Sequence, residues 1–247
     1  MRWRALALGI GLFAVGLIVL APATLLDARL ARESHGRVRL ADAQGTLWSG
    51  EGRLEVRDAQ GRSAYASALA WHLSPLSLLR ARLVYDVGLG RPAASFRLTA
   101  SPSRVELAGL DIGLPAGALG LAIPKLAVLE LSGDLRLQVG NLVAGSGYLR
   151  GDATLRWLDA SSGLTRVSPL GEYELKVDGN GASGRIQLRT LHGPLTLDGG
   201  GAWRPGTAPA VTATAHIPPQ YRDQLSPLLR LIAVERGPGE FDLRLPQ

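Results

Sequence analysis

The chain contains no cysteine, and this absence excludes disulfide frameworks, thiolate nucleophiles and cysteine-ligated metal sites. Lysine occurs only at Lys125 and Lys176, so almost all of the 27 basic residues are arginines. These arginines alternate with acidic or apolar residues and form no block, although the formal net charge is +6. Because nucleic-acid-binding faces show clustered basic residues, we expect no nucleic-acid partner.

Motifs of common enzyme chemistries are also absent. The sequence has no G-x-S-x-G nucleophile elbow, no H-E-x-x-H zinc motif and no phosphate-binding P-loop. The four histidines, His35, His72, His192 and His216, are too scattered to form a short ligand pair. The acidic residues occur singly, at positions typical of turns and exposed strand faces. We therefore expect no enzymatic activity, no cofactor and no metal site.

One formal match to a nucleotide-binding motif occurs at residues 179–184, which read Gly-Asn-Gly-Ala-Ser-Gly. A dinucleotide fingerprint needs a helix that starts at these glycines, so that its N–H groups meet the pyrophosphate. Here the residues on both sides alternate in polarity as strands do. The sequence therefore predicts a β-hairpin with a loop over residues 178–184.

Residues 5–23 form an uncharged apolar run of 19 residues. As a helix this run would be about 28 Å long, close to the thickness of the hydrocarbon layer of a bilayer. Arg2 and Arg4 precede it, so we expect a cytoplasmic amino terminus and a translocated body. The expected anchor side chains are Leu6, Leu8, Ile10, Leu12, Phe13, Val15, Leu17, Ile18, Val19 and Leu20.

A cleaved signal peptide is the alternative, because Ala21-Pro22-Ala23 has the small-x-small form of a cleavage site. The run is long for a signal peptide, however, and helical apolar spacing continues over residues 24–30. In either case the residues from about 30 onward face an extracytoplasmic space. We predict a membrane anchor over residues 1–26, with a short cytoplasmic end, and a translocated β-rich domain over residues 27–247.

After residue 36 the dominant apolar period is two, as in strands with one buried face. The 31 glycines and 15 prolines fit frequent turns between such strands. We predict a mainly β fold, in which an N-terminal transmembrane helix precedes a curved, mostly antiparallel β-sheet with a few short helices. The alternating segments include Leu83 to Leu89, Leu135 to Val139, Tyr173 to Val177 and Val211 to Ile217.

Two short helices are expected between the strands. Ser74 followed by Pro75 favours a helix over residues 74–79. Apolar spacing predicts a second helix over residues 221–232, split or kinked after Ser226 by Pro227. Residues 109–124 are rich in glycine and low in charge, which suggests a connection between two halves of one sheet, with strands resuming at Gly133.

A phrase that starts and ends with glycine recurs along the chain, for example over residues 45–50, Gly-Thr-Leu-Trp-Ser-Gly. A related spacing follows Trp71 and Trp157: each precedes a Ser-Pro-Leu triplet and then a tyrosine, which suggests one strand-and-turn unit used more than once. We expect Trp48 to lie in the core, covering a site that lacks a side chain, rather than to serve as a ligand platform. The structural motif residues are Gly45, Leu47, Trp48, Gly50, Trp157, Gly171, Tyr173, Gly193 and Pro194.

With these motifs in this order, the chain resembles the type II secretion system protein N family of Gram-negative bacteria. The matching segments are the apolar run that ends near Pro22 and residues 45–50, 133–137, 147–157, 170–173 and 193–199. The resemblance implies an inner-membrane protein with a periplasmic domain, and an accessory role in exporting folded proteins across the outer membrane. Its implied partners are the inner membrane and other secretion-system proteins, and it implies no catalytic residues.

A second hypothesis comes from the architecture alone. Strands of period two with glycine-punctuated turns are also typical of the long curved sheets of periplasmic lipid-handling proteins. If the apolar face of the sheet is open, a lipid or another hydrophobic ligand becomes a credible partner, because large exposed apolar surfaces are otherwise rare. A closed sandwich would favour contacts with proteins alone.

Overall fold

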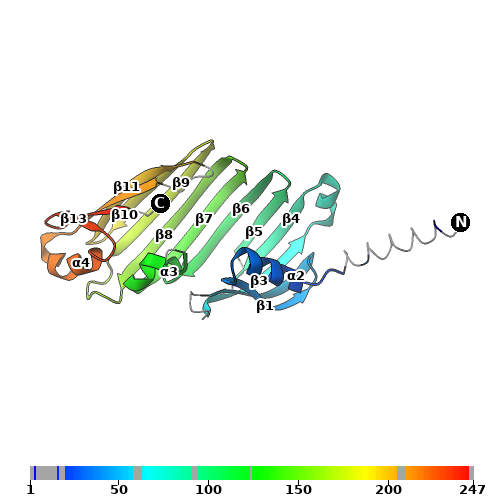
Figure 1. Ribbon diagram of the computed structural model, residues 1–247, viewed down its shortest axis with the longest axis horizontal. Coiled ribbons are helices and arrows are strands. Elements are labelled where there is room, and N and C mark those ends of the chain that lie inside the picture. The colour runs from blue at the N-terminus through cyan, green and yellow to red at the C-terminus, as the bar shows by residue number, and fades with distance from the viewer. Residues whose placement is uncertain are drawn as a thin grey trace. The chain divides into compact units, whose positions relative to one another are not determined.

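The chain divides into two compact units, residues 1–94 and 95–247. The computed structural model describes Trp3, Gly16 and residues 20–57, 63–90, 94–122, 124–204 and 210–244. These residues form fourteen strands and a few short helices, which are shown in Figure 1. Every observed strand pair within each unit is antiparallel. The predicted mainly β fold, with an antiparallel sheet and few helices, is confirmed, whereas the curvature of the sheet stays a prediction.

The first unit is a four-stranded meander preceded by a helix. The helix α2 (Thr24–Glu33) leads into the strands, and the 3-10 helix η1 (Pro75–Arg80) joins β3 to β4. The strands pair in chain order, each with the next. Their bounds are β1 Val38–Gly45, β2 Ser49–Arg57, β3 Ser63–Leu73 and β4 Leu83–Leu89.

The second unit is a longer open sheet in which strands β5 to β12 follow one another, with β14 and then β13 at the end. The longest strands, β7 and β8, have 15 residues each. The strand bounds are β5 Ala94–Ser101, β6 Arg104–Pro115, β7 Leu131–Gly145, β8 Tyr148–Ser162, β9 Gly171–Gly181, β10 Gly184–His192, β11 Thr196–Trp203, β12 Ala210–His216, β13 Val234–Gly237 and β14 Glu240–Arg244. The helices are α3 Ala118–Ala122, η2 Pro124–Leu129, η3 Pro219–Tyr221 and α4 Arg222–Leu229.

A core in the second unit forms where α4 packs on one face of the sheet. Leu225, Leu228 and Leu229 of α4 are buried against residues of β12 and β14. The largest of these partners is Phe241, which has no exposed surface. Burying side chains of this size contributes about 1.5–3 kcal/mol each, so α4 anchors the last strands.

The first unit has a smaller core between α2 and the meander. Leu40 of β1 and Trp71 of β3 are buried, and Leu26 and Leu30 of α2 pack against this cluster. Asp27 of α2 also accepts hydrogen bonds from the backbone N–H of Leu40 and, in a two-pronged contact, from the Arg39 guanidinium. A helix and a carboxylate thus cover the outer edge of β1, which would otherwise expose unpaired backbone groups.

The two expected helices form close to the predicted positions. The 3-10 helix η1 begins at Pro75, as predicted for a helix over residues 74–79. In the second helix, Pro227 lies inside α4 and does not divide it, so the split is not observed and the alternative, a kink after Ser226, stays a prediction. The helical stretch continues through Pro227 because leucines on either side of it are buried in the core.

The region 109–124 is more ordered in structure than its composition predicts. Strand β6 extends through it to Pro115 and pairs along its length with β7. The short helix α3 then follows, and β7 begins at Leu131, two residues before the predicted restart. Apolar residues at alternate positions, such as Leu110 and Ile112, provided a strand signal that the glycines obscured.

The hairpins β3–β4 and β8–β9 share the features of the predicted repeated unit. In each, a tryptophan on the first strand lies near a tyrosine on the second: Trp71 faces Val87, two residues from Tyr85, and Trp157 faces Tyr173. Both indole N–H groups donate to a backbone carbonyl 25 residues earlier in the chain, at 3.1 Å. A tryptophan held in this way fixes the connection that precedes the hairpin.

Among the residues that the structure describes, no helix has both the length and the apolar character needed to cross a bilayer. The predicted anchor residues Leu6, Leu8, Ile10, Leu12, Phe13, Val15, Leu17, Ile18 and Val19 lie outside the described residues. Leu20, the last of the predicted set, is described and is 73% exposed.

Candidate interaction surface

One face of the second unit's sheet consists of three apolar ladders that run across neighbouring strands. The strand registers place the members of each ladder opposite one another, and hydrogen bonds of the Thr190 side chain to Leu197 continue the third ladder from β10 to β11. The middle ladder is Ile112, Leu137, Leu155, Leu175, Leu188, Gly199, Ala213 and Leu243; beside it lie Leu110, Val139, Ala153, Val177, Ile186, Gly201 and Val211 on one side, and Leu114, Leu135, Trp157, Tyr173, Thr190, Leu197, Ala215 and Phe241 on the other. We call these residues the apolar face.

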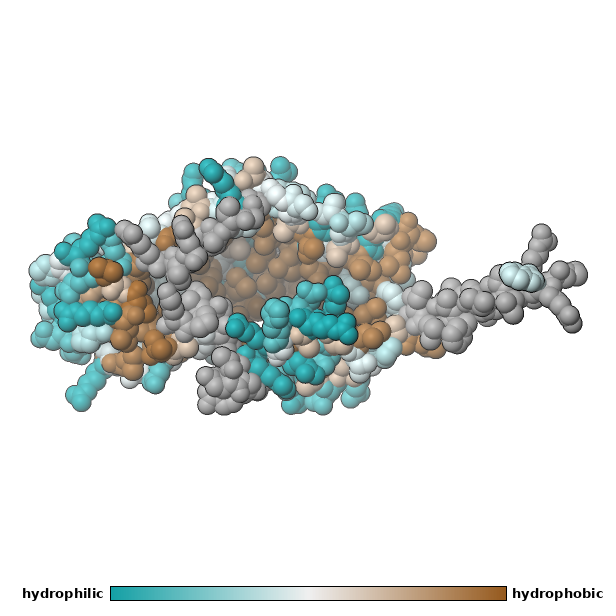
Figure 2. Space-filling view, viewed as in Figure 1, coloured by the Kyte–Doolittle hydropathy of each residue, from teal (hydrophilic) through white to brown (hydrophobic). Residues whose placement is uncertain are grey.

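The apolar face is only partly covered by the described chain. Ala215 and Phe241 beside α4 are buried, as are Leu135 and Val139 of the two outer ladders. By contrast, the middle-ladder residues Ile112, Leu137, Leu155 and Leu175 are partly exposed. The described helices of the second unit lie towards the strand ends, and none of them crosses the middle ladder (Figure 1). Figure 2 shows apolar residues gathered over the middle strands, where the surface is hollowed. A partly exposed apolar surface of this extent marks a binding surface more often than a solvated one.

The opposite face of the same strands is charged, and its centre is Glu174 of β9. Glu174 has no exposed surface, yet it contacts three cations. Its Oε2 accepts from Arg156 of β8 at 2.8 Å, its Oε1 accepts from Arg189 of β10, and the Lys176 Nζ lies 3.6 Å away. Residues Arg156 and Arg189 lie directly opposite Glu174 in the register, so these contacts tie three strands together.

The electrostatic balance at Glu174 keeps its carboxylate ionised. Burial by itself would raise the pKa of Glu174, because it disfavours the charged form. Hydrogen bonds from Arg156 and Arg189, with the charges of Arg189 and Lys176, outweigh burial and hold the pKa below its ordinary value of 4.5. A carboxylate fully engaged by three cations is a structural group and is not free to act as an acid or base.

The predicted motif residues of the first unit lie together at one turn, where they hold the entry to the fold. Residues 45–50 join β1 to β2, and the Leu47 N–H donates to the Ala21 carbonyl at 2.8 Å. The Ala23 N–H donates to the Gly45 carbonyl at 3.2 Å, so the turn is hydrogen-bonded to residues 21–23 at two points. Gly45 has a φ of 90°, a conformation that glycine adopts without strain.

The structure corrects the prediction for Trp48. Trp48 is partly exposed, and the tryptophan in the core is Trp71, which is 5% exposed. A Cβ added at Gly50 would lie 2.6 Å from the Trp71 ring, so Trp71 fills the space that this glycine leaves open. The indole of Trp71 also donates to the Thr46 carbonyl in the same turn. Both tryptophans are large apolar residues in the same part of the sequence, and the pairing of Gly50 with Trp71 determines which of them is buried.

The predicted motif residues of the second unit also lie together. The rings of Trp157 and Tyr173 are 5.8 Å apart between centroids and tilted by 50°. Gly171 and Gly193 approach so closely that a Cβ on Gly193 would overlap the Cα of Gly171. Leu195, which follows Pro194, forms two hydrogen bonds beside this close approach. Its N–H donates to the Leu170 carbonyl, and its carbonyl accepts from the Tyr173 hydroxyl at 2.9 Å. Burial raises the pKa of Tyr173, which keeps this hydroxyl protonated.

The formal nucleotide motif at residues 179–184 forms the predicted hairpin. Strand β9 extends to Gly181 and β10 starts at Gly184, so the turn is shorter than the predicted loop over residues 178–184. The Asn180 N–H donates to the Ser183 carbonyl at 3.0 Å, and the Ser183 hydroxyl donates to the Asn180 side chain. Because a strand and not a helix follows the glycines, no helix N-terminus is present for a pyrophosphate.

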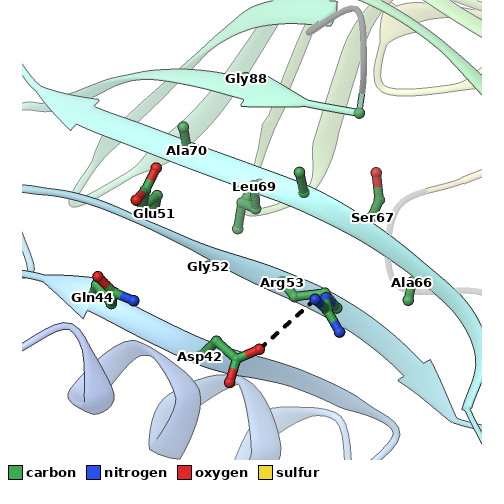
Figure 3. Close-up of a pocket in the computed structure, with 12 residues that line it drawn as sticks. Asp42, Gln44, Glu51, Gly52, Arg53, Ala66, Ser67, Leu69, Ala70 and Gly88 are labelled. Atoms are coloured by element: carbon green, nitrogen blue, oxygen red, sulfur yellow. Dashed lines mark ion pairs between the residues drawn. The ribbon is translucent and has the colours of Figure 1, made fainter.

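A pocket of about 760 Å³ lies on the first unit, lined by residues of β1 to β4 (Figure 3). Most of its lining side chains are small, as at Ala66, Ala68 and Ala70. Its charged pair, Asp42 and Arg53, is 4.0 Å apart and largely exposed, so water competes for both groups. This pocket therefore offers less binding energy than the apolar face of the second unit.

No cluster of three or more potential metal-ligating side chains occurs among the residues that the structure describes. Several acids on the charged face are engaged by arginines. Asp111, for example, accepts from both Arg136 and Gln138, and these hydrogen bonds lower its pKa to about 2. The apolar face, rather than a polar site, is thus the strongest candidate for function.

Comparison with protein families gives a match to the model of the type II secretion system protein N over residues 36–244. This chain belongs to that family. The match covers most of the chain, including both units and all the described strands. Membership supports an accessory role in type II secretion, and the family is not known as an enzyme family. No significant match is found among curated proteins or among solved structures.

Proposed function

We propose that this member of the protein N family acts in the periplasm as an accessory of the type II secretion machinery, and that it binds other secretion-system proteins through the apolar face. The apolar run over residues 5–23 anchors it in the inner membrane, with the amino terminus in the cytoplasm. Family membership supports the secretion role. The partly exposed ladders of the second unit support recognition by contact instead of catalysis.

The two faces of the sheet differ in a way that favours this assignment. On the charged face, described side chains satisfy one another, as in the Glu174 cluster. On the apolar face, the leucines of the middle ladder remain partly exposed. Covering them with a partner lowers the free energy by roughly 25 cal/mol for each Å² of apolar surface removed from water. Partner binding is therefore best supported on the apolar face.

The test is secretion in cells that lack the gene. We expect normally exported proteins to accumulate in the periplasm of the deletion strain and the wild-type gene to restore export. A gene carrying Leu155→Asn, which puts an amide in the middle ladder, should restore export poorly. The matched control is Thr154→Asn, at the neighbouring position on the opposite face. Unchanged export in the deletion strain would contradict the proposal.

A hydrophobic ligand is the second candidate, favoured by the composition of the middle ladder. This ladder crosses eight strands without a hydrogen-bonding side chain, over about 34 Å at the usual strand spacing. An unbroken apolar strip of this kind suits an acyl chain. Native mass spectrometry of the full chain should then show lipid adducts that Leu155→Asn weakens and Thr154→Asn leaves intact. Unchanged export with an altered outer-membrane lipid profile would favour this candidate.

A further inference from the structure

The connection between β3 and β4 displays leucines to solvent. Residues 75–83, which we call the leucine turn, include η1 and lie beside the label of β4 in Figure 1. Leu76 is 78% exposed and Leu79 is 84% exposed, and Leu78 and Leu83 are also exposed. Single exposed leucines are common on protein surfaces, but four within eight residues form an apolar patch of the kind that marks an interaction site.

Hydrogen bonds hold the leucine turn in a defined shape. The Ser77 hydroxyl donates to the Ser74 carbonyl at 2.6 Å and accepts from the Val84 N–H at 3.3 Å. The Arg82 N–H donates to the Ser77 carbonyl, and Ala81 closes the turn in a left-handed conformation. The leucines therefore point outward from a framework that is formed without a partner.

The charge of the leucine turn is entirely positive. It contains Arg80 and Arg82, and residues 73–85 include no acid. Both arginines are exposed, and neither forms an ion pair with any described residue. Exposed leucines next to unpaired arginines are complementary to the interface of an anionic bilayer, where apolar side chains enter the acyl region and arginines meet phosphates.

The turn of residues 45–50 links residues 21–23, at the end of the apolar run, to the strand that leads into the leucine turn. The run ends at Ala21 to Ala23, which hydrogen-bonds to the turn of residues 45–50. The carbonyl of Trp48 in that same turn accepts from the Leu73 N–H, just before the leucine turn begins. One short turn thus connects residues 21–23 to Leu73, two residues before the leucine turn begins.

We propose that the leucine turn inserts into the interface of an anionic phospholipid bilayer and gives the first unit a second membrane contact beside the apolar run. This inference rests on the proposed anchor, because the same bilayer holds both segments. The apolar run fixes the chain to the membrane, and the leucine turn fixes the orientation of the first unit on it. Leu76 and Leu79 enter the bilayer, and Arg80 and Arg82 bind lipid phosphates.

The absence of cysteine allows a direct test with the full chain. Leu79→Cys is labelled with an environment-sensitive fluorophore and reconstituted in phosphatidylcholine vesicles with or without phosphatidylglycerol. The matched control is Ala66→Cys, an exposed position about 23 Å from the turn along β3. We expect blue-shifted emission, and quenching by spin-labelled acyl chains, at residue 79 and not at residue 66. The effect should be stronger with phosphatidylglycerol.

Replacing both arginines, Arg80→Glu with Arg82→Glu, should weaken insertion on the order of tenfold or more. A label at residue 79 that is as water-exposed as one at residue 66, in both kinds of vesicle, would overturn the proposal and direct attention to a protein partner. Flotation separates this result from failure of the anchor. If only the leucine turn fails to insert, the full chain still floats with the vesicles; if the apolar run is no anchor, the chain does not float.

Discussion

Glu174 shows how a buried charge can stabilise this sheet without serving as a chemical site. Its carboxylate is fully buried, but each of its cationic partners is about half exposed. The partners therefore keep much of their hydration while they neutralise the buried charge, which lowers the desolvation cost of the cluster. The cluster holds β8, β9 and β10 in one register and so keeps the ladders on the opposite face aligned.

We predict that Glu174→Gln lowers the free energy of unfolding by about 2 kcal/mol, because it removes charge-assisted hydrogen bonds and leaves three cations close together. Asp178→Asn is the matched control, since Asp178 lies on the same strand and face but is exposed. It should change stability by less than about 0.5 kcal/mol. Urea unfolding of the full chain in detergent measures both. Equal stability of the two variants would contradict the structural role of Glu174.

The same carboxylate predicts a pH dependence. The pKa of Glu174 is lower in the folded protein than its ordinary value of 4.5, so the carboxylate stabilises the fold fully above that value. This contribution is lost as the pH falls from 4.5 through the folded-state pKa. The stability difference between the wild type and Glu174→Gln should therefore shrink over this range in a series of urea titrations. A difference that stays constant with pH would show that Glu174 does not titrate as described.

At the level of residues, the sequence predicted several structurally important positions correctly, but it predicted the packing of individual side chains less well. The glycine-bounded phrase at residues 45–50 pointed to a structural turn, and the turn binds the entry segment. The sequence did not distinguish Trp48 from Trp71, because the choice depends on which strand faces Gly50. Glu174 gave no signal, since burial of a charge on a strand depends on the residues opposite it.

At the scale of elements, the turn between β1 and β2 forms hydrogen bonds with three other segments of the first unit. It binds the segment of residues 21–23, the indole of Trp71 and the N–H of Leu73 at the end of β3. These contacts connect the end of the apolar run to the first sheet through backbone hydrogen bonds.

We predict that Trp71→Phe loosens this element selectively. The hydrogen bond to the Thr46 carbonyl is lost, at a cost of about 1 kcal/mol. The Cζ2 and Cη2 atoms of Trp71, which lie against Gly50, are lost as well. The amides of Leu47 and Ala23 should then exchange faster in hydrogen–deuterium exchange. Trp157→Phe removes the equivalent bond in the second unit and serves as the control. If it accelerated exchange at these two amides equally, the local role of Trp71 would be wrong.

Secondary structure was predictable wherever one period dominated. The alternation of Leu135 to Val139 and Tyr173 to Val177 predicted strands that the structure contains, and Pro75 marked the start of η1. Pro227 misled the prediction of a split in α4, because tertiary burial of the neighbouring leucines outweighs the hydrogen bond that proline cannot donate. The glycines at residues 109–124 misled in the same way, since strand pairing with β7 holds that segment extended.

On the scale of the whole molecule, the second unit's sheet carries two different surfaces. Alternation along each strand predicted one apolar and one polar face, but not which residues stand side by side. Register supplies that information, and it lines up Leu137, Leu155 and Leu175 as neighbours in one ladder. The division between units at residue 94 also left no sequence signal, because alternating strands lie on both sides of it.

The account rests on the claim that the apolar face is where the protein meets other secretion-system proteins. Site-specific photocrosslinking in secreting cells tests it most directly, with p-benzoylphenylalanine at position 155 on the apolar face or at position 154 on the charged face. We predict crosslinks to other secretion-system proteins from position 155 and few or none from position 154. Crosslinks to such proteins from position 154 alone would contradict the account.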